Sequence, residues 1–179
     1  MVNKIQISLA FDISNHPESM TKSILSWGKR SRKDVNMLPH ALSDPSIEVG
    51  YHGKGMEREF YLYKGPKCVG AATFERCEID APIKRYFPSG TLVATPHIDL
   101  APEVRGLGIA SAIYLMAVKS YVLATDHQSA SAAKLWDSVA RKSGSVIYYY
   151  DEISKKFVDD PDQGNTWKVL TKVKPRGIK

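Results

Sequence analysis

The sequence has few cysteines and lacks any long apolar run. Its two cysteines, Cys68 and Cys77, stand nine positions apart among residues typical of strands. Such a pair makes neither a zinc quartet nor a disulfide framework, so we expect a reduced, cytoplasmic setting and no metal site. Nothing approaches the roughly eighteen consecutive apolar residues of a membrane-spanning helix, and the start has no cleavage-like site. We therefore expect neither a membrane partner nor a signal peptide.

Length and charge are those of an ordinary globular chain. At 179 residues and 43% hydrophobic, it is long enough for one core, so we expect a single domain over 1–179. The formal charge of +6 gathers at Lys29–Lys33 and Lys172–Lys179, whereas 151–162 is acidic. A positive balance suits an anionic ligand or a nucleic-acid partner, although solubility explains most such charges. No pattern fixes the oligomeric state, which leaves a homodimer open.

The stretch Pro96–Met116 carries the sharpest local pattern. Residues 97–100 alternate polar and apolar side chains, as in a half-buried strand, and Pro102 then interrupts any ladder. From Ile109 onwards the apolar residues follow helical spacing. The pattern therefore predicts a strand, a loop containing glycine, and a helix.

A junction of this kind favours an anion. The start of a helix has unpaired N–H groups and a partial positive charge, and glycines allow a phosphate to approach the backbone. Gly106 and Gly108 lie in the loop, and Arg105 adds a permanent cation. The alternative is an ordinary tight loop in which the glycines only relieve steric crowding. The segment contains neither Gly-Lys-Ser/Thr nor three spaced glycines, which argues against nucleotide hydrolysis and hydride transfer.

These residues also resemble a known signature. Arg105-x-x-Gly108-x-Ala110 is similar to the pyrophosphate-binding signature of the GNAT superfamily of acyl-CoA-dependent N-acyltransferases, which lies between a central splayed strand and the following helix. The family's second signature is Asn, two residues, Ala, three residues and Tyr. Ser129, Ala132 and Trp136 stand at its positions. The Leu-Trp variant of that signature also resembles acetyltransferase-like proteins carried by bacteriophages.

The resemblance implies a fold of the α/β (α+β) class. It predicts a mixed, mostly antiparallel sheet of six to seven strands, flanked by about four helices, with two splayed central strands. The sequence pattern predicts helices over 17–27, from about 107, and over 129–140, with Ser129 as N-cap and Gly144 as terminator. It predicts strands at the following ranges: 4–11, 57–63, 68–77, 91–100, 121–125, 146–150 and 166–173.

The activity implied by the resemblance is transfer of an acetyl or another short acyl group from coenzyme A to an amine, without a metal. The cofactor-binding residues it implies are Ile98, Leu100, Arg105, Gly106, Leu107, Gly108, Ile109, Ala110, Ser111, Ser129 and Trp136. Main-chain groups of Ile98 and Leu100 would pair with pantetheine. The candidate bases are His97, Asp99, Asp126 and His127.

Trp136 departs from the family pattern, because an indole N–H is only a hydrogen-bond donor and is no practical acid for a thiolate. We interpret Trp136 as a core residue in preference to a wall of the cleft. Three hypotheses stay open. The chain transfers the acyl group to a small amine, or it uses the same donor with a nucleic-acid or protein acceptor. In the third, it is a non-catalytic module that binds coenzyme A.

Overall fold

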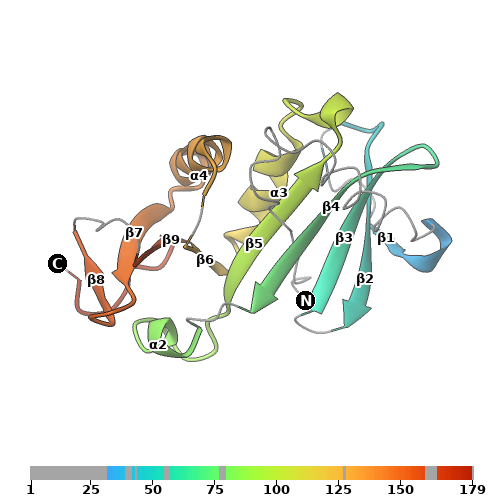
Figure 1. Ribbon diagram of the computed structural model, residues 1–179. Helices are drawn as coiled ribbons and strands as arrows, with labels where there is room; N and C mark the ends of the chain where they lie inside the picture. Colours follow the sequence, from blue (N-terminus) through green and yellow to red (C-terminus); the bar gives the residue numbers. More distant parts are fainter. Residues whose placement is uncertain are drawn as a thin grey trace. The chain divides into compact units, whose positions relative to one another are not determined.

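The computed structural model describes residues 32–38, 42, 44–54, 57–76, 80–126, 128–159 and 165–178. Within this part of the chain it is an α+β protein with one mixed sheet of nine strands, in the order β1-β2-β3-β4-β5-β6-β9-β7-β8 (Figure 1). The strands are β1 Asn36–Leu38, β2 Glu48–Lys54, β3 Glu57–Lys64, β4 Lys67–Arg76, β5 Val93–Leu100, β6 Val122–Thr125, β7 Val146–Asp151, β8 Lys156–Val158 and β9 Thr166–Thr171. The α-helices are α2 Asp80–Lys84, α3 Ile109–Ala117 and α4 Ala130–Ser143, with short 3-10 turns η2 Arg32–Asp34 and η3 Pro102–Val104.

The predicted number of six to seven strands is wrong, because the sheet has nine. β1 and β8 are three residues long, which is too short to show an alternating pattern. β2 contains Gly50 and Gly53, and glycines weaken the strand pattern. The short α2 lies between the predicted strands over 68–77 and 91–100, in a range for which no helix was predicted. The predicted strand over 4–11 and the helix over 17–27 fall outside the described residues.

The chain divides into two compact units. The first unit contains residues 3–75 and 96–113, and the second contains 76–95 and 114–179. The single domain over 1–179 stays a prediction.

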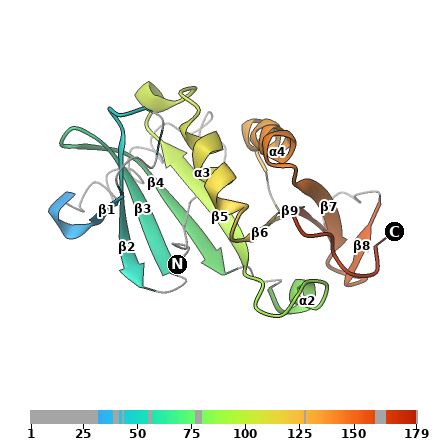
Figure 2. The same ribbon diagram turned by 180° about the vertical axis from the view of Figure 1, so that it is seen from behind.

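In the first unit, β3 and β4 form a hairpin around the joint Gly65-Pro66, two residues that are typical of tight turns. Lys64 pairs with Lys67 across the turn, and Gly65 has the positive φ of 58° that such a turn requires. The N–H of Ala101 donates to the carbonyl of Val69 at 2.8 Å, so β4 lies beside the end of β5. The β3–β4 turn and η3 therefore lie at the same end of the strands, as Figures 1 and 2 show from opposite sides.

The second unit contains α2, the start of β5, the last turn of α3 and everything that follows α3. β5 and β6 pair in parallel, whereas β6, β9, β7 and β8 pair antiparallel. Its core is an aromatic cluster in which Phe87, after α2, packs with Tyr150 and Trp167. The predicted N-cap Ser129 and terminator Gly144 of α4 are both confirmed by the capping geometry, although the helix continues to Ser143, three residues beyond the predicted end. Within the part of the chain that the structure describes, no helix has the length and apolar character needed to cross a membrane.

Candidate functional site

The loop between β5 and α3 has the predicted order of strand, glycine loop and helix. Pro102 begins η3, where its missing N–H costs nothing, and the buried Val104 fixes the turn to the core. The helix begins at Ile109, two positions after the predicted start, because the N–H of Ala112 donates to the carbonyl of Gly108 at 2.9 Å. Gly108 therefore stands at the N-terminal boundary of α3.

Both glycines of this loop adopt a left-handed backbone. Gly106 and Gly108 each have a φ of 75°, a region that residues with a side chain rarely adopt. A Cβ built on either glycine would meet no protein atom within 4 Å. Crowding therefore does not explain the glycines, and the space beside them is open. The following amides of Ile109 and Ala110 lie in the first helical turn, where the N–H groups have no acceptor within the helix.

Arg105 places a cation beside this loop. Its Nε donates to the carbonyl of Leu100 at 2.9 Å, and its own N–H donates to Pro102 at 3.2 Å. The residue is exposed, so the side chain is tied to the end of β5 while the guanidinium stays at the surface. A permanent positive charge and the start of α3 thus lie next to each other. That combination favours a multiply charged anion such as a diphosphate.

The predicted residues on β5 differ in their accessibility. Ile98, Asp99 and Leu100 are buried, at 7%, 2% and 8% exposure, whereas His97 is half-buried. Because β5 is a strand through Leu100, alternate residues His97 and Asp99 project to the same side. A carboxylate as deep as Asp99 is stable only with a hydrogen-bonding or charged partner. The carbonyl of Leu100, one group proposed to pair with pantetheine, already accepts from Arg105.

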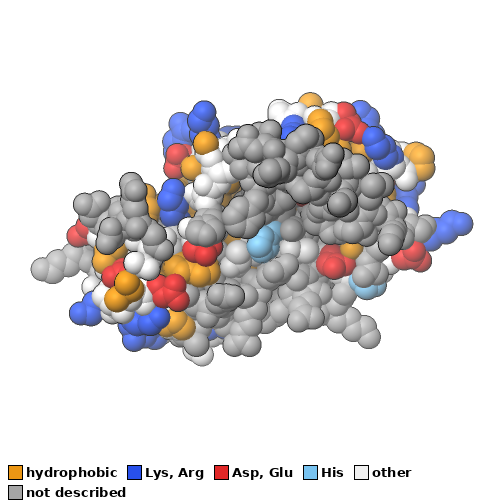
Figure 3. Space-filling model, viewed as in Figure 1, with side chains coloured by type: hydrophobic (Ala, Val, Ile, Leu, Met, Phe, Trp, Pro, Cys, Tyr) orange, Lys and Arg blue, Asp and Glu red, His pale blue; other side chains and the backbone are white. Residues whose placement is uncertain are grey.

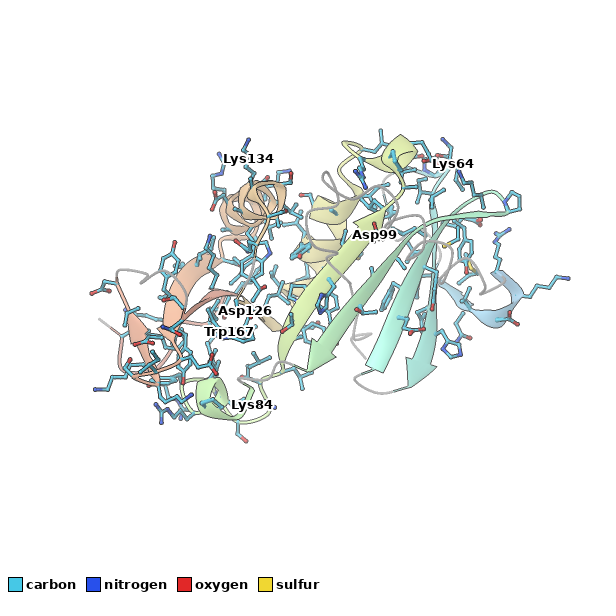
Figure 4. All side chains as sticks on the ribbon, viewed as in Figure 1. Lys64, Lys84, Asp99, Asp126, Lys134 and Trp167 are labelled. Atoms are coloured by element: carbon cyan, nitrogen blue, oxygen red, sulfur yellow. The ribbon has the colours of Figure 1, made fainter. Side chains whose placement is uncertain are left out.

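The remaining predicted residues belong to the second unit. Asp126 is exposed directly after β6, where Figure 4 labels it, and His127 lies outside the described residues. Ser129 is the N-cap of α4, since its hydroxyl accepts from the N–H of Ala132 at 3.2 Å. The structure therefore brings the loop together with His97 and Asp99 in the first unit. It assigns Asp126, Ser129 and Trp136 to the second.

Trp136 is a core residue. Its side chain has no exposed surface, and its ring lies edge-on to that of Tyr114, with 6.3 Å between the centroids. Burial raises the pKa of Tyr114 far above its usual range, and the neighbouring indole acts in the opposite direction. The structure thus agrees with the interpretation of Trp136 that the sequence favoured. It leaves no surface of Trp136 for a ligand.

Charged residues that no sequence pattern indicated flank the loop. Lys67, at the start of β4, forms an ion pair with Glu103 in η3. The hydrogen bond from Lys67 lowers the pKa of Glu103, and the charge of Lys64 lowers it further. The Gly-Pro turn gave the position of both lysines along the chain. Their approach to η3 depends on the pairing of β4 with β5, which no local pattern encodes.

A scan against protein-family models and a search of curated proteins both found no match for this chain. Within the described residues, no three His, Cys, Asp or Glu side chains gather closely enough to hold a metal ion. The functional interpretation therefore depends on the geometry of the loop itself. The groups of this loop that could bind a ligand are its main-chain amides, next to two left-handed glycines, and the side chain of an arginine.

Proposed function

We propose that this protein is an acyl-CoA-dependent N-acyltransferase that moves an acetyl or another short acyl group from coenzyme A to an amine. The observation that carries the proposal is the pair of left-handed glycines with open space beside them, between β5 and the first turn of α3. Arg105, anchored on Leu100, supplies the adjacent cation. These groups would hold the diphosphate of the co-substrate.

The pairing of β5 with β6 also supports this proposal. Their parallel ladder has two residue pairs, Val93 with Val122 and Ala94 with Leu123, although β5 continues to Leu100. We propose that pantetheine would use main-chain groups of β5 beyond this ladder.

In the proposed reaction, the co-substrate supplies an acyl group activated as a thioester. The nitrogen of the acceptor amine attacks the thioester carbonyl, a C–N bond forms, and the C–S bond breaks to release a thiolate. The proton lost by the amine must reach a base. His97 is the half-buried candidate on β5, because an imidazole can accept a proton near neutral pH, directly or through water. Asp99, Asp126 and His127 stay as alternative candidates.

A second candidate function is a non-catalytic module that binds coenzyme A. The specific observation in its favour is the burial of Trp136 at the position where the resembling family has a tyrosine acid. An indole N–H cannot protonate a thiolate in practice. Transfer without a dedicated acid is chemically reasonable, since a thiolate is a fair leaving group. Release of free thiol from acetyl-CoA in the presence of an amine panel separates the two functions.

A macromolecular acceptor is the third candidate. Lys172, Lys174 and Arg176 are exposed after β9, which suits a nucleic-acid or acidic protein partner. Of the other basic cluster, Lys29 and Arg30 lie outside the described residues, and Arg32 forms an ion pair with Glu48. Retention on heparin that disappears at moderate salt would support this candidate, and no retention would count against it.

Calorimetric titration with acetyl-CoA tests the proposed anchor. Arg105→Glu and Gly108→Asp should abolish binding, because each puts a negative charge where the diphosphate would lie. Arg141→Glu is the matched control, since Arg141 is an exposed arginine of α4 that also donates its Nε to a main-chain carbonyl, that of Asp137. Loss of binding in all three variants, or in none, would contradict the proposed anchor. Native mass spectrometry of the purified protein would identify a retained acyl-CoA.

A further inference from the structure

Two lysines close the hairpin that lies beside the candidate site. Lys64 and Lys67 are register partners at the end of the β3–β4 ladder, so their side chains start from directly opposite positions. Both residues are exposed. Like charges at opposite positions repel each other. This pair is therefore a concentrated positive charge that an anion would stabilise.

The hairpin places these lysines near the loop between β5 and α3. Lys67 reaches Glu103 in η3, two positions before Arg105, and Lys64 contributes to the electrostatic stabilisation of the same carboxylate. All of these residues belong to the first unit. Figure 4 labels Lys64 at the end of the strands where η3 lies. In Figure 3, lysine and arginine side chains gather with acidic ones over that end.

We infer that Lys64 and Lys67 bind a phosphomonoester, which on the proposed function is the ribose 3′-phosphate of coenzyme A. This inference rests on the proposed function, because it needs the diphosphate to lie on the loop next to the lysines. Coenzyme A carries its phosphomonoester apart from the diphosphate, so a second cationic contact beside the loop could recognise it. A phosphomonoester has nearly two negative charges at neutral pH, and lysine binds phosphate as a point charge.

Glu103 has a defined role in this arrangement. In the structure its carboxylate pairs with Lys67, so it partly neutralises the lysines while no phosphate is bound. A phosphate carries more charge than a carboxylate and would replace Glu103 as the partner of Lys67. Removing the carboxylate should therefore strengthen binding of a ligand with the 3′-phosphate more than binding of a ligand without it.

The test compares coenzyme A with 3′-dephospho-coenzyme A by calorimetric titration at fixed low salt. With two surface contacts to the phosphate, the wild-type protein should bind coenzyme A about tenfold more tightly. The double variant Lys64→Ala/Lys67→Ala should bind both ligands nearly equally. The control Lys119→Ala/Lys134→Ala removes the same charge from two exposed positions of the second unit and should keep the preference. Glu103→Gln should increase the preference.

The outcomes separate the two proposals. If neither ligand binds the wild-type protein, the proposed function is overturned. If both bind equally well, the loop still accepts a diphosphate, and the assignment of the lysines is overturned. A preference that survives in the Lys64→Ala/Lys67→Ala variant, or that the control variant also loses, overturns it too. Thermal melting of each variant checks that it is folded. The double variant should melt normally, because it removes both a like-charge pair and an exposed ion pair to Glu103, and each contributes little to stability.

Discussion

Replacing Gly108 with alanine separates the conformational role of this glycine from its role in binding. Its φ of 75° lies in the left-handed region, whereas a Cβ at this position would meet no protein atom within 4 Å. The protein itself thus has room for the methyl group, and only the left-handed backbone conformation should destabilise the folded variant. A bound diphosphate beside the loop would meet that methyl group. Stability and ligand affinity should therefore respond to different degrees.

The expected loss of stability is small. An L-residue in the left-handed region costs about 1–2 kcal/mol. Replacing glycine with alanine also restricts the unfolded chain, which returns about 0.4–1 kcal/mol. The net loss should lie between zero and about 1.6 kcal/mol. A loss of about 1 kcal/mol corresponds to a fall in Tm of about 2–4 °C for a chain of this size. Urea unfolding followed by circular dichroism measures this quantity.

Gly144 offers a matched control. It ends α4 with a φ of 69° and also has nothing within 4 Å of a built Cβ. Gly144→Ala should therefore lose a similar amount of stability while acetyl-CoA affinity stays unchanged. Gly108→Ala should weaken the binding of acetyl-CoA by about tenfold or more, which corresponds to a loss of at least about 1.4 kcal/mol in binding free energy.

Two results would refute this reasoning. If Gly108→Ala unfolds at higher urea than the wild-type protein, the left-handed conformation is not required at this position. If it loses stability but binds acetyl-CoA with wild-type affinity, the open side of the loop is not where the anion binds. The second result would leave the fold unaffected and remove the main support for the proposed function.

Three further predictions concern packing and pH. Gly70→Ala should destabilise the protein by about 1–3 kcal/mol in urea unfolding. The added Cβ would lie 2.7 Å from Leu100 Cδ2 and 2.8 Å from the main-chain oxygen of Asp99. An unchanged unfolding midpoint would contradict this close approach. Trp136→Ala should lower the free energy of unfolding by about 3–5 kcal/mol in the same assay, since the indole is fully buried against Tyr114. A loss below about 1 kcal/mol would show that the ring is not in the core. Burial raises the pKa of the Cys68 thiol, so the folded state holds that proton more tightly than the unfolded state. Stability should therefore fall as pH rises above about 8.5, the ordinary pKa of a thiol. In Cys68→Ala, Tm should fall less steeply between pH 8 and 10 than in the wild-type protein. Equal slopes of Tm against pH would show that this thiol does not cause the fall.

The elements predicted correctly from the sequence have local signals. The β3–β4 hairpin follows from Gly65 and a proline between two runs of β-forming residues, and α4 follows from the Ser129 cap and Gly144. Each signal acts within a few residues of the element that it defines. The additional strands have no such signal. β1 becomes a strand because Asn36 and its neighbours pair with β2, and this pairing joins positions far apart in the sequence.

The candidate site also combines features that are local in sequence with features that depend on long-range pairing. The glycines and Arg105 were identified because the loop is continuous in sequence, and the structure supplies their left-handed geometry and the bond from Arg105 to Leu100. The ion pair between Lys67 and Glu103 joins residues 36 positions apart. Its formation depends on the register of two ladders, so no spacing rule could reveal it. Long-range electrostatics of this kind becomes visible only once strand order is known.

A site built from main-chain amides places few demands on side chains. The N–H groups of the loop exist whatever residues occupy it, so only the positions that need a left-handed backbone or a fixed cation are constrained. In the site proposed for this chain, those positions are Gly106, Gly108 and Arg105. Leu107, between the two glycines, is 52% exposed and has no packing role that would fix its identity. Three constrained positions carry little information in a chain of 179 residues. An anion site of this type can therefore persist on the same strand-loop-helix geometry after overall sequence similarity has been lost.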